Sequence, residues 1–230
     1  SRVKLGGNIS SWNFESLKKN LSFGLALLPH SVFVFVLGYV DKVYVNTYSS
    51  EVIAGSYFLM FQVSQICLLV PAAVNKVFVP WLFNNGSDTS KVEFIFKLRN
   101  TVLFALSMTF FCGLAALFGY VVLLFIGEKN SYEIIGSVFI ILCVTAIFDS
   151  FYLFAVNLLH FVEKTKIISM ITLTSVVGTV FLLSVIGPIY GIVGAALSCL
   201  LGSLIRFVLS FSIGMREFKS YHLNKQVLNF

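Results

Sequence analysis

The chain has 230 residues, of which 58% are hydrophobic and only 11% are charged, and its net charge is +6. Because a soluble domain carries about a quarter charged residues, this composition excludes a soluble domain and indicates a protein that lies mostly in lipid. The positive charge then fits basic cytoplasmic loops, and no segment has the pattern of a nucleic-acid-binding motif.

The four cysteines, Cys67, Cys112, Cys143 and Cys199, lie inside apolar runs and form no CxxC pair. We expect small buried side chains rather than disulfides or metal ligands. The chain starts at Ser1 with no signal peptide before its first apolar run, so we expect a truncated or processed chain, or one taken from a longer protein.

Hydropathy predicts an all-α, polytopic membrane protein with one transmembrane bundle over residues 21–213. Residues 1–20 are expected to form a polar cytoplasmic segment or linker, and residues 214–230 a basic cytoplasmic tail. The six expected helices cover residues 21–40, 52–83, 101–126, 134–161, 167–186 and 191–213.

The first expected helix contains a proline, Pro29, which should bend or break it. His30 is either a neutral histidine bonded to backbone that Pro29 frees, or part of a polar path. Asp41 lies eleven residues later on the same stripe, beside Lys42. It is either an interfacial residue paired with that lysine or a functional residue.

The second expected helix carries two amides and a lysine on an apolar background. At about 100° per residue, Gln62, Gln65 and Lys76 fall within about 60° of one another, and Pro71 and Pro80 divide the helix near its second end. The three side chains form either one wall of a polar path through the membrane, or a helix–helix hydrogen-bond stripe with a snorkelling lysine.

The fourth expected helix has a polar face made by Thr145, Asp149, Tyr152 and His160, which lie within about 80° of one another. Asp149 falls near the middle of the membrane. A carboxylate at that depth is costly unless it is paired or hydrated.

The last two expected helices are suited to close packing. The fifth carries the small residues Thr172, Thr174, Ser175, Gly178 and Thr179, and residues 187–190 predict a hairpin turn. In the sixth, Gly194, Ser198 and Gly202 form a small-xxx-small face. Arg206 lies one step further, at about the depth of Asp149, and either pairs with it or snorkels alone to the cytoplasmic interface.

Lys and Arg are distributed unevenly between the two sides of the expected bundle. Twelve fall in the N-terminal segment, the connections 84–99 and 162–166, and the tail, whereas Lys42 and Lys129 fall on the opposite side. Since cytoplasmic loops carry the excess of Lys and Arg, we expect both ends of the chain in the cytoplasm.

The sequence lacks the common catalytic motifs. It has no Walker loop, no HExxH and no GxSxG, and its three histidines fall in different segments. We therefore expect neither an enzyme nor a metal or cofactor site, but a carrier or a scaffold.

Several short motifs resemble, in the same order, those of the Wzx-type polysaccharide-export flippases of the multidrug/oligosaccharidyl-lipid/polysaccharide exporter superfamily. They are L-P at 28–29, D-K at 41–42, A-G-S-Y at 54–57, E-K-T-K-I-I-S-M-I-T at 163–172 and G-P-I-Y-G-I-V-G-A-A-L-S at 187–198. The resemblance implies the C-terminal six-helix lobe of a twelve-helix, two-lobed transporter in the bacterial inner membrane.

The same resemblance implies a substrate and partners. The substrate would be an undecaprenyl-diphosphate-linked oligosaccharide, such as an O-antigen repeat unit, moved by alternating access through a cationic cavity. The implied partners are membrane lipids, the N-terminal six-helix lobe and the polysaccharide polymerase machinery.

In this interpretation Lys76 supplies the cation for the diphosphate, and Gln62 and Gln65 bond sugar hydroxyls. The other candidate substrate-binding residues are His30, Asp41, Asp149, Tyr152 and Arg206. Two alternatives stay open: a drug or cation antiporter of the same superfamily that uses Asp41 and Asp149, and a six-span scaffold that transports nothing.

Overall fold

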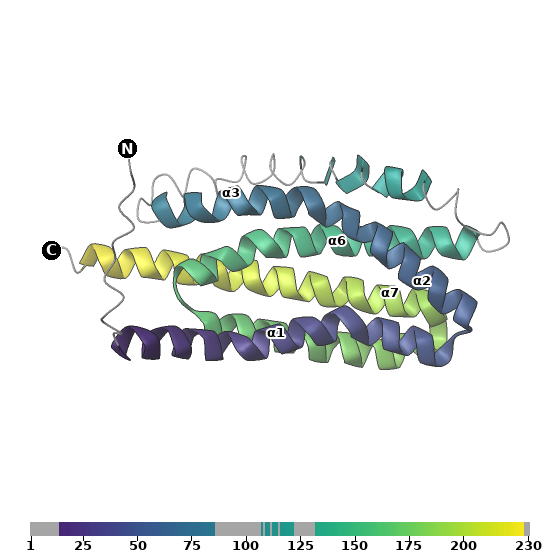
Figure 1. The fold of residues 1–230 in the computed structure, drawn as a ribbon, viewed down its shortest axis with the longest axis horizontal. Helices are drawn as coiled ribbons and strands as arrows, with labels where there is room; N and C mark the ends of the chain where they lie inside the picture. Colours follow the sequence, from purple (N-terminus) through teal and green to yellow (C-terminus); the bar gives the residue numbers. More distant parts are fainter. Residues whose placement is uncertain are drawn as a thin grey trace.

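The computed structural model describes residues 14–85, 107, 109–110, 112–114, 116–121 and 132–227, and these residues form helices without any strand, as predicted. The helices run roughly along one common axis (Figure 1). The described elements are α1 (Phe14–Tyr48), α2 (Glu51–Ser64), the 3₁₀ turn η1 (Gln65–Leu68), α3 (Leu69–Asn85), α6 (Tyr132–Phe161) and α7 (Thr165–Val227).

Within the described residues, four helical stretches are long and apolar enough to cross a membrane, which fits the predicted membrane protein. The third expected helix, over residues 101–126, lies largely outside the described residues, where only the short apolar helix Cys112–Val121 is seen in part. The count of six spans therefore stays a prediction. The four stretches are Leu28–Tyr48, Glu51–Asn85, Gly136–Phe161 and Thr165–Tyr221.

Helix α7 folds back on itself at Gly191, whose backbone has φ 55° and ψ −128°. Only glycine adopts this conformation without strain. Ser175 Oγ donates to the Gly202 carbonyl at 2.6 Å, although 27 residues separate them in sequence. A straight helix would place them about 40 Å apart. The two arms of α7 are therefore antiparallel, so the predicted reversal is present, but it lies at Gly191, directly after the predicted turn residues 187–190, which are helical.

The α7 arms approach closely along the predicted small-residue face. Gly194, Ser198 and Gly202 are buried, and a Cβ atom added at Gly202 would collide with the hydroxyl of Thr179 on the other arm. Thr172, Ser175 and Thr179 are fully buried. This confirms the close packing expected for these residues, whereas Thr174, which was expected on the same packed face, is exposed.

Pro29 does not break α1, which is one helix from Phe14 to Tyr48, so the expected break is wrong. The helix contacts α7 directly after the proline and again further along its C-terminal half. His30 bonds to Thr172, and Tyr44 lies against Gly187. These tertiary contacts hold the helical path even though the proline removes one backbone hydrogen bond.

Pro71 has a visible structural consequence at the junction of η1 and α3. Because proline has no N–H, it leaves the carbonyl of Cys67, four residues earlier, without its helical donor. The thiol of Cys112 donates to that carbonyl at 3.4 Å, and the thiol of Cys67 donates to the Cys112 carbonyl at 3.5 Å. Cys67, Cys112 and Cys143 are buried, as expected, and no disulfide links the described cysteines.

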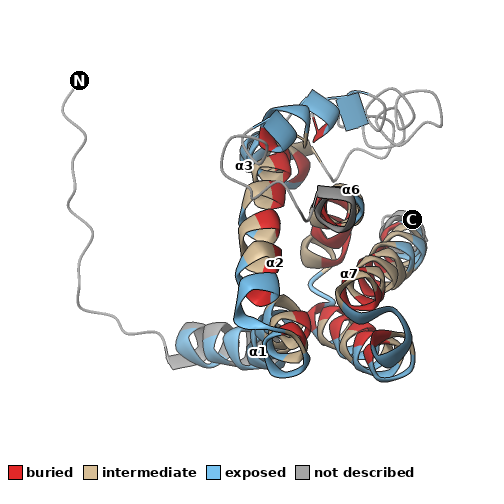
Figure 2. Cartoon of the chain, turned by 90° about the vertical axis from the view of Figure 1, so that its right-hand side faces the viewer, coloured by how far each residue is buried: buried red, intermediate tan, exposed pale blue. Residues whose placement is uncertain are grey.

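The start of α1, the end of α3 and the end of α7 lie at the same end of the bundle (Figure 1). The α1–α2 connection and the turn of α7 lie at the other end. In the view along the bundle, buried residues gather where α1, α6 and α7 face one another, and much of α1 and α2 is exposed outward (Figure 2). This arrangement agrees with the predicted topology, whereas the side that faces the cytoplasm stays a prediction.

We predict that Gly202→Ala lowers the stability of the protein by about 1–3 kcal/mol, because the added methyl forces the two α7 arms apart. The control is Gly55→Ala on α2, where an added Cβ meets no atom within 4 Å. Thermal denaturation in detergent compares the two. Equal melting temperatures would contradict the close approach of the arms.

Candidate functional site

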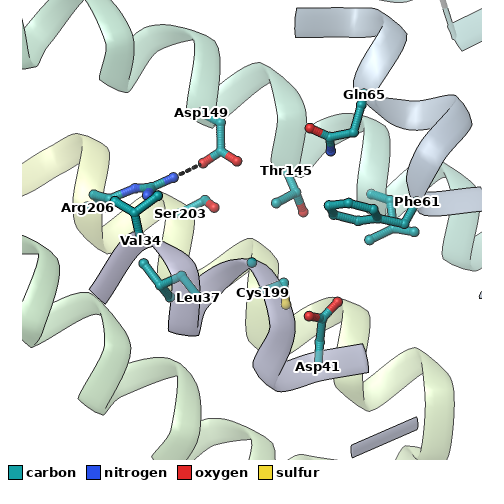
Figure 3. A pocket seen from close by; sticks show the side chains of 12 residues that line it. Val34, Leu37, Asp41, Phe61, Gln65, Thr145, Asp149, Cys199, Ser203 and Arg206 are labelled. Carbon is teal, nitrogen blue, oxygen red and sulfur yellow. Dashed lines mark hydrogen bonds and ion pairs between the residues drawn. The ribbon is translucent and has the colours of Figure 1, made fainter. Parts of the chain in front are cut away.

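A cavity of about 220 Å³ lies between α1, α2, η1, α6 and α7. Its walls carry side chains from elements far apart in sequence, and Figure 3 shows them pointing into one common space. Four of the predicted site residues line it: Asp41, Gln65, Asp149 and Arg206. Its polar lining residues are Asp41, Gln65, Thr145, Asp149, Ser203 and Arg206.

Arg206 forms an ion pair with Asp149, with Nη2 and Oδ1 2.5 Å apart. Both side chains are largely buried, and the guanidinium lies over the ring of Tyr152, with Cζ 4.3 Å from the ring centroid. Helix α6 and the second arm of α7 run in the same direction (Figure 1), which brings the two residues to one depth. Of the two alternatives for Arg206, the structure has the pair rather than the lone snorkelling arginine.

Asp41 is the second buried carboxylate, with 1% of its surface exposed. The hydroxyl of Tyr57 donates to its Oδ2 at 2.7 Å, and Lys42 Nζ lies 3.4 Å from its Oδ1. Lys42 also donates to the Gly38 carbonyl at 2.7 Å, and its ammonium lies 3.2 Å from the centroid of the Phe61 ring. The pairing with Lys42, one of the two alternatives left open by the sequence, is present, and both side chains are largely buried among the helices.

The charges around the cavity are balanced. Each carboxylate has its own cation, Arg206 for Asp149 and Lys42 for Asp41. A buried charge is tolerated when it is paired and hydrogen-bonded, so the two pairs lower the cost of a polar cavity among apolar helices. The described residues around this cavity therefore supply no unpaired positive charge, and the cationic cavity implied by the family resemblance stays a prediction.

His30 and Tyr152 lie beside the cavity rather than in its lining. The Nδ1 atom of His30 is 2.8 Å from the hydroxyl of Thr172, which itself donates to the Ile168 carbonyl at 2.9 Å. Because a hydroxyl has one proton, Nδ1 carries the hydrogen and donates to Thr172. The backbone partner expected for His30 is thus replaced by a side chain on α7. Tyr152 is buried, and its hydroxyl has no hydrogen-bond partner in the described part of the chain.

The three polar residues predicted to share a face of the second helix are separated. Gln65 lines the cavity, Gln62 lines a neighbouring groove, and Lys76 is exposed and lines neither. Gln62 and Gln65 still line neighbouring spaces, and the 3₁₀ turn η1 is the physical reason for the displacement of Lys76. Each of the four residues of η1 turns the chain by about 120° rather than 100°, which rotates α3 by roughly 80° relative to α2.

Sequence reasoning missed several residues at the site. Tyr57 and Phe61, which hold Asp41 and Lys42, come from the facing helix α2. Their pairing depends on the crossing of two helices, which no local pattern encodes. Ser203, one turn before Arg206, could have been found as the polar continuation of the small-residue face.

Comparison with known proteins adds no assignment. The chain matches no protein-family model, and neither the curated proteins nor the solved structures give a match. Among the residues that the structure describes, no three His, Cys, Asp or Glu side chains are placed to hold a metal ion.

We predict that Asp149→Ala destabilises the protein by about 3–5 kcal/mol, because it leaves the buried Arg206 charge unpaired. Replacing both partners, Asp149→Leu with Arg206→Met, should restore most of the stability. The control is Glu217→Ala, which breaks the partly exposed pair with Lys164 and should cost at most about 1 kcal/mol.

Thermal denaturation and the yield of membrane-inserted protein measure these effects. An Asp149→Ala variant as stable as the Glu217→Ala variant would show that the Asp149–Arg206 pair does not form in the membrane.

Proposed function

We propose that the protein is one lobe of a transporter that moves an undecaprenyl-diphosphate-linked oligosaccharide across the bacterial inner membrane by alternating access. The observation that carries the proposal is the polar cavity with two buried ion pairs inside helices of membrane-spanning length. Ionisable residues buried within membrane helices are costly, and they commonly mark substrate or ion pathways. The short family motifs quoted above support the same class of protein.

The charged contacts around the cavity join different helices, which allows these helices to move relative to one another. Asp149 on α6 is held by Arg206 on α7, and Asp41 on α1 is held partly by Tyr57 on α2. A relative movement of these helices breaks or reforms a charged contact. Buried ion pairs that differ between two arrangements give a bundle two discrete states, which alternating access requires.

Lys76 is the cation we assign to the diphosphate. Lys42 and Arg206 are each neutralised by a carboxylate, whereas Lys76 is exposed and has no ion pair among the described residues. Because it faces away from the cavity, a second six-helix lobe would complete its binding site. Six spans, cytoplasmic ends and a partnership with polysaccharide polymerase machinery belong to this proposal.

A drug or cation antiporter of the same superfamily is the second candidate. The observation that favours it is that Asp41 and Asp149 line one cavity, while Lys76 lies outside it. A six-span scaffold is the third, and it requires the ion pairs only for stability. The variants below separate the three candidates.

We predict that the double variant Asp149→Leu/Arg206→Met, in the full-length protein, inserts and folds but exports less than about a tenth of the normal surface polysaccharide, because the polar path becomes apolar. The measurement is surface glycan per molecule of inserted protein. If this variant exports the normal amount of glycan, the Asp149–Arg206 pair has only a structural role. If the variant lowers the resistance of the cells to cationic drugs but leaves surface glycan unchanged, the antiporter is favoured.

We predict that Lys76→Ala reduces surface glycan at normal protein abundance, whereas Lys76→Arg retains more activity because the positive charge is kept. The control is Lys166→Ala, since Lys166 is an exposed lysine at the start of α7. Normal glycan output from an abundant Lys76→Ala variant would remove Lys76 from the substrate path. In that case the lysine only anchors the end of its helix.

A further inference from the structure

A second, larger and more open groove of about 670 Å³ runs between α1 and α2. It shares Gly38 and Phe61 with the cavity described above, so the two spaces are neighbours. Along α1 it extends from Gly38 to Thr47, which is about 13 Å of helix. It therefore approaches the end of the bundle opposite to the start of α1 (Figure 1).

Two carboxamides stand in this groove. Asn46 on α1 and Gln62 on α2 are both exposed, and neither has a hydrogen-bond partner among the described residues. An amide left unbonded against hydrocarbon costs free energy, so these two side chains need a polar occupant. The hydroxyl of Thr47 donates to the Val43 carbonyl and keeps its acceptor lone pairs for a ligand.

The groove offers no free charge. Lys42, the cation in its wall, is only 12% exposed and is held by the Gly38 carbonyl, Asp41 and the Phe61 ring. An anionic head group would gain little attraction from Lys42, because Asp41 neutralises its charge, and a cationic ligand would be repelled by the Lys42 ammonium. The groove therefore suits an uncharged polar ligand.

Aromatic side chains complete the lining. Tyr39, which is about half exposed, and Phe58 lie on the two facing helices. Aromatic faces are negative and attract the weakly positive C–H groups of a sugar ring, while a planar carboxamide offers donors and an acceptor to adjacent hydroxyls. Amides beside aromatic faces, without a net charge, form a surface suited to carbohydrate.

We propose that the α1–α2 groove binds the carbohydrate part of the transported molecule. This inference rests on the proposed function, and it places the sugar apart from the diphosphate that is assigned to Lys76. The groove lies toward the end of the bundle away from the start of α1. Because the proposed function places the start of α1 in the cytoplasm, the sugar in the groove lies toward the outer side of the membrane. Phe61, with the Lys42 ammonium over its ring, then separates the sugar site from the ion-paired cavity.

The test uses the full chain in nanodiscs of phosphatidylethanolamine and phosphatidylglycerol. Three photoreactive probes with the same alkyl chain carry maltose, phosphocholine or trimethylammonium as the head group. Mass spectrometry maps the labelled peptides. The maltoside should label residues 38–47 and 58–62 saturably, and free maltose should compete. The double variant Asn46→Leu/Gln62→Leu should raise the maltoside concentration that gives half-maximal labelling about tenfold, because two hydrogen-bonding side chains are lost.

The control is Asn84→Leu, since Asn84 is an exposed amide on α3 outside the groove, and labelling should be unchanged. Equal labelling by all three probes would show that the groove holds only the alkyl chain, and stronger labelling by trimethylammonium would show a cation site. Either result overturns the carbohydrate site. If glycan export still depends on Asp149 and Arg206, such a result leaves the proposed transport function standing.

Discussion

The burial of Arg206 beside Asp149 is the constraint on which the rest of the bundle depends. A lone charge among apolar helices would cost several kcal/mol, so each residue requires the other at the same depth. That match requires α6 and the second arm of α7 to run side by side in the same direction. This parallel alignment requires that the chain reverses at Gly191 and that the two α7 arms pack closely at Gly202. The turn and the small residues thus serve the ion pair.

The second pair, Asp41 with Lys42, ties α1 to α2 through Tyr57 in the same way. Between the two pairs lies a polar space lined by Asp41, Asp149 and Arg206, with Lys42 paired to Asp41 beside it. The proposed function requires that this cavity admits water and polar groups. Its walls come from helices joined by a reversal and by a 3₁₀ turn rather than from one rigid element. Polar content and walls drawn from several helices are features that suit the transport path proposed above.

Local chemistry in the sequence was sufficient for the all-α class, for four apolar helices of membrane-spanning length, for a chain reversal next to residues 187–190 and for the common depth of Asp149 and Arg206. It failed where tertiary contacts override local patterns. Pro29 leaves α1 unbroken because α7 supports it, and His30 bonds to a side chain on α7. The common face assigned to Gln62, Gln65 and Lys76 assumed 100° per residue, which the 3₁₀ turn does not follow. Facing-helix partners such as Tyr57 require a knowledge of which helices cross.

The central claim is that the cavity between the ion pairs is a water-accessible path and not a sealed polar core. Thr145 lines the cavity and Ile140 lies on the exposed face of the same helix, so the two positions differ mainly in their surroundings. In a Cys199→Ser background, the account predicts that Thr145→Cys reacts with a membrane-impermeant thiol reagent in intact membranes and that Ile140→Cys does not. An unreactive Thr145→Cys in a folded, inserted protein would contradict it.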